Sequence, residues 1–253
     1  MTEGTAIILA AGRGRRMEPD RAKVLLPVGG RPMVLHVVDA AREAGAARVI
    51  AVVGCEADRV RAMLPPDVET VPQVEQLGTG HATRCAHPLL KGADGGVWVL
   101  CGDSPLVTGE SLHDMAELGA GHDAACVLMS FLGKEDASYG RVVRGVVRGD
   151  DGRIVRIVER KDASEGEAAI REFNAGTYWF RARDLFDALD RVDNANTQGE
   201  YYLTDVVGLL VERGLRVLPY LATRPGEGLG VNSPEDLQRV EETFLARQKG
   251  GAS

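Results

Sequence analysis

The sequence contains few cysteines, four among 253 residues, and no two of them form a Cys-x-x-Cys pair. Thiolate metal sites need closely spaced cysteines or clusters of cysteine and histidine, so we do not expect a zinc site. Cys101 lies in an apolar run, where a buried free thiol is ordinary. This cysteine usage is typical of a reducing compartment, and we expect the chain to be cytoplasmic.

Long apolar runs and a leader segment are also missing. No apolar stretch approaches the roughly 20 residues that a membrane helix requires. The N-terminal sequence MTEGTAIILAAG has no positively charged region before its short apolar run, unlike a signal peptide. We therefore expect neither membrane insertion nor export.

An excess of positive charge is absent, since the formal net charge is −7. A uniformly acidic protein does not attract nucleic acid or an anionic membrane, so neither is expected as a partner. A bound anion must then meet a local concentration of positive charge. Such a concentration occurs near the N-terminus at Arg13, Arg15, Arg16, Arg21 and Lys23. An anion site and a solvated basic loop are both possible, and charge alone would favour the solvated loop.

Strand-like and helix-like segments alternate over the first part of the chain. Apolar runs predict buried strands over 5–10, 48–54, 68–72, 97–101 and 123–131, and helical spacing predicts helices over 32–45, 56–64, 79–90 and 109–119. Such alternation is typical of right-handed βαβ units. The predicted fold class is therefore α/β, a Rossmann-like and mainly parallel sheet flanked by helices.

The pattern changes after residue 131. Strands are predicted over 140–148 and 153–159, joined by an Asp-Gly turn, and over 174–181. We interpret this stretch as a small antiparallel insertion beside the sheet. A helix over 202–214 and a strand over 215–221 follow. The last helix opens at Ser233-Pro234, an N-cap followed by proline in the first turn.

A glycine-rich loop, GRGRRM at 12–17, follows the first predicted strand. Glycines let the backbone approach phosphate oxygens and direct N–H groups at them. The dinucleotide fingerprint requires a third glycine where this chain has Met17, and the P-loop requires Gly-Lys-Ser/Thr, which is absent. A phosphate-binding loop of another kind and a plain turn both remain open.

Two further segments carry polar groups beyond predicted strands. Asp103 directly follows a buried strand and a glycine, where a carboxylate can hold Mg²⁺ together with phosphate oxygens or can cap a helix. The sequence QVEQLGTG at 73–80 offers amides that can read the edge of a base, or it is a polar loop in which Thr79 caps a helix. Ligands of parallel sheets bind at the carboxyl ends of the strands, where both Asp103 and the glycine-rich loop lie.

Eight short motifs occur along the chain between residues 6 and 245. They are LAAGRGRRM at 9–17 with Lys23 downstream, QLGTGHA at 76–82, GDSPL at 102–106, YGR at 139–141, VERKDA at 158–163, FNAGTY at 173–178, QGEYYLTD at 198–205 and GVNSPEDL at 230–237. In this order they resemble the sugar nucleotidyltransferases, and most closely the uridyltransferase half of the bacterial bifunctional enzymes that make UDP-N-acetylglucosamine.

The resemblance implies roles for particular residues. Nucleotide-binding roles are implied for Leu9, Ala10, Ala11, Gly12, Gly14, Lys23, Gln73, Gln76, Gly78 and Thr79. Sugar-binding roles are implied for Cys101, Gly102, Gly140, Glu159, Asn174 and Thr204. Asp103 and Asn232 are the implied Mg²⁺ ligands, and Arg16, Lys23 and Asp103 are the implied catalytic residues.

The implied reaction is Mg²⁺-dependent transfer of a uridylyl group from UTP to N-acetylglucosamine 1-phosphate, with release of pyrophosphate. A phosphate monoester is largely dianionic at neutral pH, so no general base is required, in agreement with the lack of a histidine-centred motif. The resemblance also implies a single nucleotidyltransferase domain over 1–253. Its nucleotide part would span about 1–131 and its sugar part about 132–232, with a C-terminal helix and tail over 233–253.

Two residues depart from the family pattern near the expected sugar. Cys101 stands where the family often has an aromatic residue, and Ser138 where it often has glycine. Glucose 1-phosphate with UTP or dTTP is therefore an alternative substrate pair, and a non-catalytic nucleotide-sugar-binding module is a second alternative. The bifunctional enzymes continue into an acetyltransferase β-helix. We expect no such domain here, and a monomer or weak oligomer without it.

Overall fold

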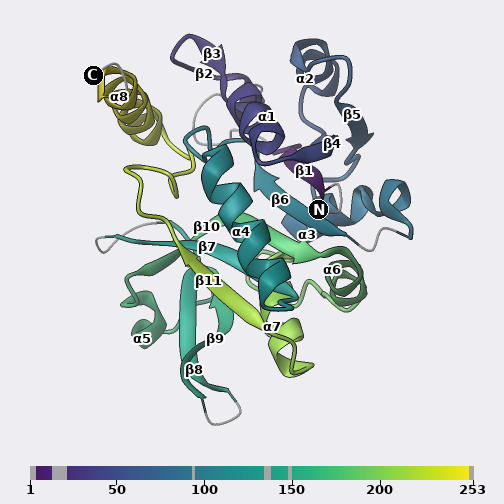
Figure 1. Cartoon of the computed structure of the whole chain (residues 1–253), viewed down its shortest axis with the longest axis vertical. Helices are drawn as coiled ribbons and strands as arrows, with labels where there is room; N and C mark the ends of the chain where they lie inside the picture. Colours follow the sequence, from purple (N-terminus) through teal and green to yellow (C-terminus); the bar gives the residue numbers. More distant parts are fainter. Residues whose placement is uncertain (1–3, 13–21, 93–94, 134–137, 148–149, 251–253) are drawn as a thin grey trace.

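The computed structural model describes residues 4–12, 22–92, 95–133, 138–147 and 150–250. Its strands are β1 (Gly4–Ala10), β2 (Pro27–Val28), β3 (Arg31–Pro32), β4 (Ala46–Val53), β5 (Glu69–Pro72), β6 (Gly96–Cys101), β7 (Cys126–Leu132), β8 (Arg141–Val147), β9 (Asp150–Val158), β10 (Glu172–Arg181) and β11 (Val217–Leu221). Within these ranges nine strands form one sheet, whose main order is β11-β7-β10-β6-β1-β4-β5. The β8–β9 hairpin extends from it beside β10 (Figure 1).

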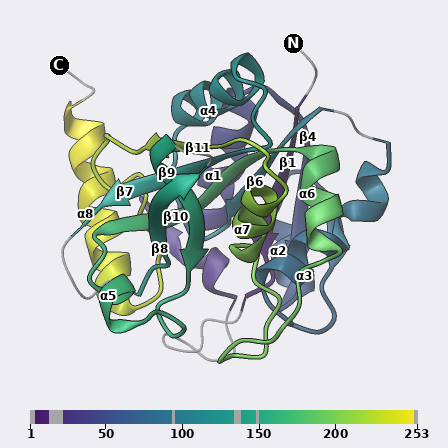
Figure 2. The same cartoon turned by 90° about the horizontal axis from the view of Figure 1, so that it is seen from below.

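Helices cover both faces of this sheet (Figure 2). They are α1 (Met33–Glu43), α2 (Ala57–Met63), α3 (Thr79–Cys85), α4 (Gly109–Gly121), α5 (Glu165–Ala168), α6 (Ala182–Leu189), α7 (Asp205–Glu212) and α8 (Pro234–Gly250), with the short 3-10 helices η1 (Lys23–Leu25) and η2 (His87–Leu90). Helices α1, α2 and α4 supply one apolar core, and α3, α6 and α7 supply the other. The predicted α/β fold class is confirmed. Within the described ranges, no helix has the length and apolar character needed to cross a membrane.

Strand β1 lies at the point of the sheet where the order of strand addition reverses, with β4 and β5 on one side and β6 on the other. It pairs in parallel with β4 on one side and with β6 on the other. Leu9 of β1 is in register with Cys101 of β6, so the two strands end side by side. Open parallel sheets bind ligands beyond the strand ends at such a switch point. This register therefore brings the end of the first strand next to Asp103.

Helix α8 packs away from the two main helix layers (Figure 1). It forms a smaller apolar core with the β2–β3 hairpin, in which Val240 is fully buried. Gly29, in the turn of this hairpin, has a φ of +57°, and a Cβ there would lie 2.1 Å from the ring of Phe244. As predicted, Ser233 caps the helix, since its Oγ accepts a hydrogen bond from the backbone N–H of Asp236 at 3.2 Å.

Three predicted elements differ from the structure. The helix predicted over 79–90 ends at Cys85 and is followed by η2, because Pro88 lacks the N–H that a continuing α-helix needs. The strand predicted over 174–181 is not beside the sheet but inside it, as β10 runs antiparallel between β6 and β7. The helix predicted over 202–214 begins only at Asp205, because the residues before it bond to another loop.

Candidate active site

A cavity of about 660 Å³ opens at the carboxyl ends of β1 and β6. The predicted nucleotide-binding residues that line it are Leu9, Ala11, Gly12, Lys23, Gln73, Gln76, Gly78 and Thr79. The predicted sugar-binding residues that line it are Cys101, Gly140, Glu159, Asn174 and Thr204. The predicted metal ligands Asp103 and Asn232 line it too.

Two predicted residues that the structure describes, Ala10 and Gly102, do not belong to this lining. Ala10 is fully buried, since its side chain turns into the core from the last position of β1. Gly102 is also absent from the cavity wall, and a Cβ there would lie 3.0 Å from the carbonyl oxygen of Leu9. Gly14 and Arg16 lie outside the described residues.

Lys23 connects the two predicted metal ligands. Its Nζ forms an ion pair with Asp103 Oδ2 and donates a hydrogen bond to Asn232 Oδ1 at 2.9 Å. Lys23 stands at the start of η1, Asp103 follows β6, and Asn232 precedes α8, so three distant segments meet here. The side chains of Lys23 and Asp103 are 16% and 17% exposed, which leaves one edge open to a ligand.

The position of the Lys23 ammonium suits a divalent cation. One carboxylate and one amide oxygen converge on it, and Mg²⁺ prefers such oxygens together with phosphate and water. Two protein oxygens leave most of a six-oxygen shell for these other ligands. The residues present therefore fit a metal that arrives with a phosphate-bearing substrate.

The segment that carries Asn232 is hydrogen-bonded to Tyr139, which also lines the cavity. The Tyr139 hydroxyl accepts a hydrogen bond from Gly230 N at 3.0 Å and donates one to Gly230 O at 3.1 Å. Val231 N donates to the Asp103 carbonyl at 3.0 Å. These bonds fix the backbone on both sides of the pair formed by Asp103 and Asn232.

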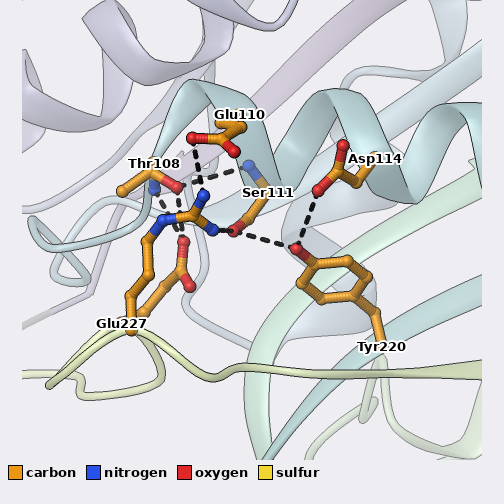
Figure 3. Close-up of polar contacts among 7 residues, drawn as sticks. Thr108, Glu110, Ser111, Asp114, Tyr220 and Glu227 are labelled. Carbon is orange, nitrogen blue, oxygen red and sulfur yellow. Dashed lines mark hydrogen bonds and ion pairs between the residues drawn. The ribbon is translucent and has the colours of Figure 1, made fainter.

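A buried carboxylate, Glu227, anchors the chain a few residues before Asn232, and Figure 3 shows its contacts with Thr108. Glu227 is 1% exposed and accepts hydrogen bonds from Thr108 N at 3.2 Å and Thr108 Oγ1 at 2.6 Å. Arg224 pairs with Glu110 at 2.6 Å and donates to Ser111 Oγ at 2.8 Å. Because Glu110 and Ser111 belong to the first turn of α4, these contacts tie the segment before α8 to the start of α4.

The predicted base-binding loop is bonded to the segment 200–203. Gly80 N donates to the Tyr201 carbonyl at 2.8 Å, and Leu203 N donates to Thr79 Oγ1 at 3.0 Å. Thr79 therefore does not cap a helix, and the N-cap of α3 is Gly78. Gly78 has a φ of +109°, and a Cβ there would lie 2.5 Å from the Tyr201 carbonyl oxygen. Only glycine permits this close approach.

The predicted sugar end of the cavity is lined by groups with defined partners. Thr204 Oγ1 donates to the Glu159 carboxylate at 3.0 Å. Asn174 Nδ2 donates to the Tyr178 hydroxyl at 2.7 Å, which leaves the Asn174 oxygen to bond to Gly176 N at 3.2 Å. Both residues that depart from the family pattern, Cys101 and Ser138, line the cavity.

Burial changes the acidity of several groups in the cavity. It raises the pKa of the Cys101 thiol to about 12, with the Asp103 charge acting in the same direction. It raises the pKa of Tyr139 to about 12 and also raises that of Glu159, although the Thr204 hydrogen bond opposes the change at Glu159. The thiol and the phenol therefore keep their protons at neutral pH, so neither is suited to act as a base.

Some cavity residues were not predicted individually. Tyr139, Gly176, Tyr178 and Gln198 line the cavity and lie within three of the motifs given above, so the motifs held the signal. Val24 forms part of the apolar wall. Nothing in its local sequence distinguishes it from other buried valines.

Comparison with known proteins agrees with this geometry. Residues 6–205 match the family described as the MobA-like NTP transferase domain. The chain belongs to this family. The predicted enzyme class, a nucleotidyltransferase, is thereby confirmed. Nucleotidyltransferases of this kind generally use a divalent metal, which the pair Asp103 and Asn232 fits.

Curated relatives of this NTP transferase domain confirm the resemblance drawn from the motifs. The chain is 43% identical to the bifunctional protein GlmU of Geobacillus sp. (strain WCH70), covering 98% of this chain and 53% of the relative. It is 44% identical to GlmU of Geobacter metallireducens, covering 98% and 52%. The chain thus spans about half the length of the curated relatives it matches.

Solved structures share the fold of this NTP transferase domain. A UDP-glucose pyrophosphorylase complexed with UDP-glucose superposes with a TM-score of 0.79 at 18% identity, covering 96% of this chain and 98% of that one. The apo form of such an enzyme gives a TM-score of 0.77, also at 18% identity. At this identity the likeness supports the architecture alone.

Proposed function

We propose that this chain transfers a uridylyl group from UTP to N-acetylglucosamine 1-phosphate and releases pyrophosphate, with Mg²⁺ as the metal. The observation that carries the proposal is the meeting of Asp103 and Asn232 on one cation position, beside the backbone of 9–12. The cavity of about 660 Å³ has the size usual for small-molecule sites. The motifs and the similarity to GlmU support uridine and N-acetylglucosamine as its occupants.

In this proposal the phosphates lie between β1 and Lys23. The backbone of 9–12 would approach the triphosphate, and Lys23 would exchange its contact with Asp103 for one with phosphate oxygens. Asp103 and Asn232 would hold Mg²⁺, which supplies charge neutralisation and polarises the phosphate when bound. Arg16 would balance charge on the leaving pyrophosphate, a role that rests on the resemblance alone.

The base and the sugar would occupy opposite ends of the cavity. Gln73, Gln76, Gly78 and Thr79 would hold the uracil, and Gly140, Glu159, Asn174 and Thr204 would contact the sugar. Glu159 would accept hydrogen bonds from sugar hydroxyls, because its carboxylate faces the cavity and is held in place by Thr204.

The chemistry needs no general base. An oxygen of the sugar 1-phosphate, already largely dianionic at neutral pH, would attack the α-phosphorus of UTP. The bond from the α-phosphorus to its bridging oxygen breaks, and pyrophosphate leaves with that electron pair. The protein then contributes position and charge complementarity, which account for much of the rate in phosphoryl chemistry.

A substrate panel tests the proposal. The protein is incubated with Mg²⁺, one nucleotide (UTP, dTTP or CTP) and one sugar phosphate (N-acetylglucosamine 1-phosphate or glucose 1-phosphate). Pyrophosphate release is followed, and the product mass is measured. We expect the fastest turnover with UTP and N-acetylglucosamine 1-phosphate. Faster turnover with glucose 1-phosphate would identify that sugar phosphate as the substrate instead. UTP binding without pyrophosphate release with any sugar phosphate would reject the proposal that the protein is an enzyme.

A further inference from the structure

The side chain of Gln73 has its amide orientation fixed by its partners. Gln73 is the first residue after β5, and it is only 4% exposed. Its amide nitrogen lies 3.0 Å from the carbonyl oxygen of Gly78 and 3.1 Å from Nδ1 of His81. A backbone carbonyl can only accept, so the group that faces Gly78 must be the NH₂.

The same geometry determines which ring nitrogen of His81 carries the proton. An NH₂ group can only donate, so Nδ1 of His81 must be the acceptor and the ring proton must be on Nε2. Gly78 is the N-cap of α3, and His81 is in the first turn of that helix. One short turn therefore presents two acceptors to the two hydrogens of the Gln73 amide.

The oxygen of the amide is then left for the cavity. No residue in the described ranges donates a hydrogen bond to Gln73 Oε1, and this atom is not sealed from solvent. Gln73 lines the cavity, so Oε1 is open to whatever binds there. Rotating the amide by half a turn would bring Oε1 against two acceptors and break both hydrogen bonds.

A fixed acceptor at this position discriminates between pyrimidines. Uracil carries a donor, N3–H, between two carbonyl groups, whereas cytosine carries an unprotonated N3 that only accepts. Facing Gln73 Oε1, the uracil edge gains a hydrogen bond and the cytosine edge meets a like dipole.

We propose that His81 is a positioning residue that sets the base preference of the site, because together with the Gly78 carbonyl it holds the Gln73 amide with its oxygen toward the cavity. This inference rests on the proposed uridylyl transfer and adds to it a residue that orients the base-reading amide of Gln73. His81 itself does not line the cavity and acts only through Gln73.

The test compares two substitutions of His81. His81→Leu removes the acceptor, while His81→Asn keeps an oxygen near the place of Nδ1. For each protein, kcat/KM is measured with UTP and with CTP, and dissociation constants for UMP and CMP are measured by calorimetry. We expect His81→Leu to lower the UTP-to-CTP ratio by about threefold to tenfold, the worth of one hydrogen bond, and His81→Asn to restore most of it.

A double substitution separates this role from a general structural one. In a Gln73→Leu background, His81→Leu should change the UTP-to-CTP ratio no further, because the amide through which it acts is gone. The ratio is internal to each protein, so a partly unfolded fraction cancels from it. Should His81→Leu fail to fold, His81→Ala replaces it.

The outcomes distinguish this inference from the proposed function. A wild-type protein that binds neither UMP nor UTP would reject the proposed function itself. A wild-type protein that uses UTP but does not discriminate against CTP would overturn the inference alone. An unchanged ratio in His81→Leu, or an equal loss in His81→Asn, would also overturn it.

Discussion

Replacing either of two glycines of helix α4 by alanine is expected to change the free energy of unfolding, but in opposite directions at the two positions. Gly119 lies over the indole of Trp179 in β10, and a Cβ there would come within 2.2, 2.3 and 2.9 Å of three ring carbons. Gly121 is at the last position of the helix, and, chain neighbours and nearby backbone of α4 aside, no heavy atom of the described residues lies within 4 Å of a Cβ placed there. The pair therefore separates helix propensity from packing within one element.

The magnitudes follow from these distances. Alanine is favoured over glycine in a helix by about 0.5–1 kcal/mol, and overpacking a core costs about 1–3 kcal/mol. The indole cannot turn away easily, because it is 7% exposed and a Cβ at Gly96 would lie 2.3 Å from its nitrogen. We expect Gly119→Ala to destabilise the protein by about 1–2 kcal/mol and to lower Tm by about 3–6 °C. Gly121→Ala should stabilise it by up to about 0.5 kcal/mol.

Urea unfolding followed by far-ultraviolet circular dichroism measures both changes. The m-value should stay the same in the two variants, since neither alters the surface exposed on unfolding. In a Trp179→Leu background, Gly119→Ala should lose most of its penalty, because the smaller side chain leaves room for the methyl group. A Gly119→Ala protein as stable as the wild type would show that the indole moves freely and would refute the packing explanation.

Three further changes address the site and its supports. Asp103→Asn should lower pyrophosphate release by about 10²–10³ without lowering Tm, and near-normal release would reject its metal role. Glu227→Ala leaves the Thr108 hydroxyl without its acceptor. We expect urea unfolding to show a free energy of unfolding lower by about 1–3 kcal/mol, and the enzyme to need a higher Mg²⁺ concentration. An unchanged Mg²⁺ requirement would show that the contact does not position the metal site. Burial, then two nearby carboxylates, raise the pKa of Asp205 to about 6, so its ionisation destabilises the fold as pH rises through that value. Near pH 8, Asp205→Asn should therefore have a higher Tm than the wild type and a free energy of unfolding larger by about 1 kcal/mol, after allowance for solvent screening. Near pH 4 the two proteins should have the same stability. Equal Tm values at every pH would contradict the pKa shift.

The sequence located the ends of β1 and β6 correctly because both strands are continuous apolar runs stopped by glycine. Their juxtaposition followed from the general rule that parallel strands end at one edge, and Leu9 and Cys101 are indeed in register. The motifs named residues from eight separate segments that line one cavity. What they could not supply was the bonding between them, such as the contact of Lys23 with both Asp103 and Asn232.

The placement of β10 could not be read from local pattern. Phe180 and Tyr178 are buried as in any interior strand. Whether such a strand pairs with β6 and β7 or lies beside the sheet is decided by partners 40 or more residues away in sequence. The break after Cys85 is different, because Pro88 carried the signal locally. The late start of α7 depended on Leu203 bonding to Thr79, a long-range contact without a local cue.

Lys23 gives the site a counter-ion of its own. Its ammonium group already balances the Asp103 carboxylate and donates a hydrogen bond to the Asn232 oxygen. In the proposed function, a divalent cation that binds there would therefore replace an existing positive charge. The exchange would add only one net unit of positive charge at that point and would free Lys23 to contact a phosphate. Metal binding and phosphate binding would thereby be linked through the single side chain of Lys23, and each should strengthen the other.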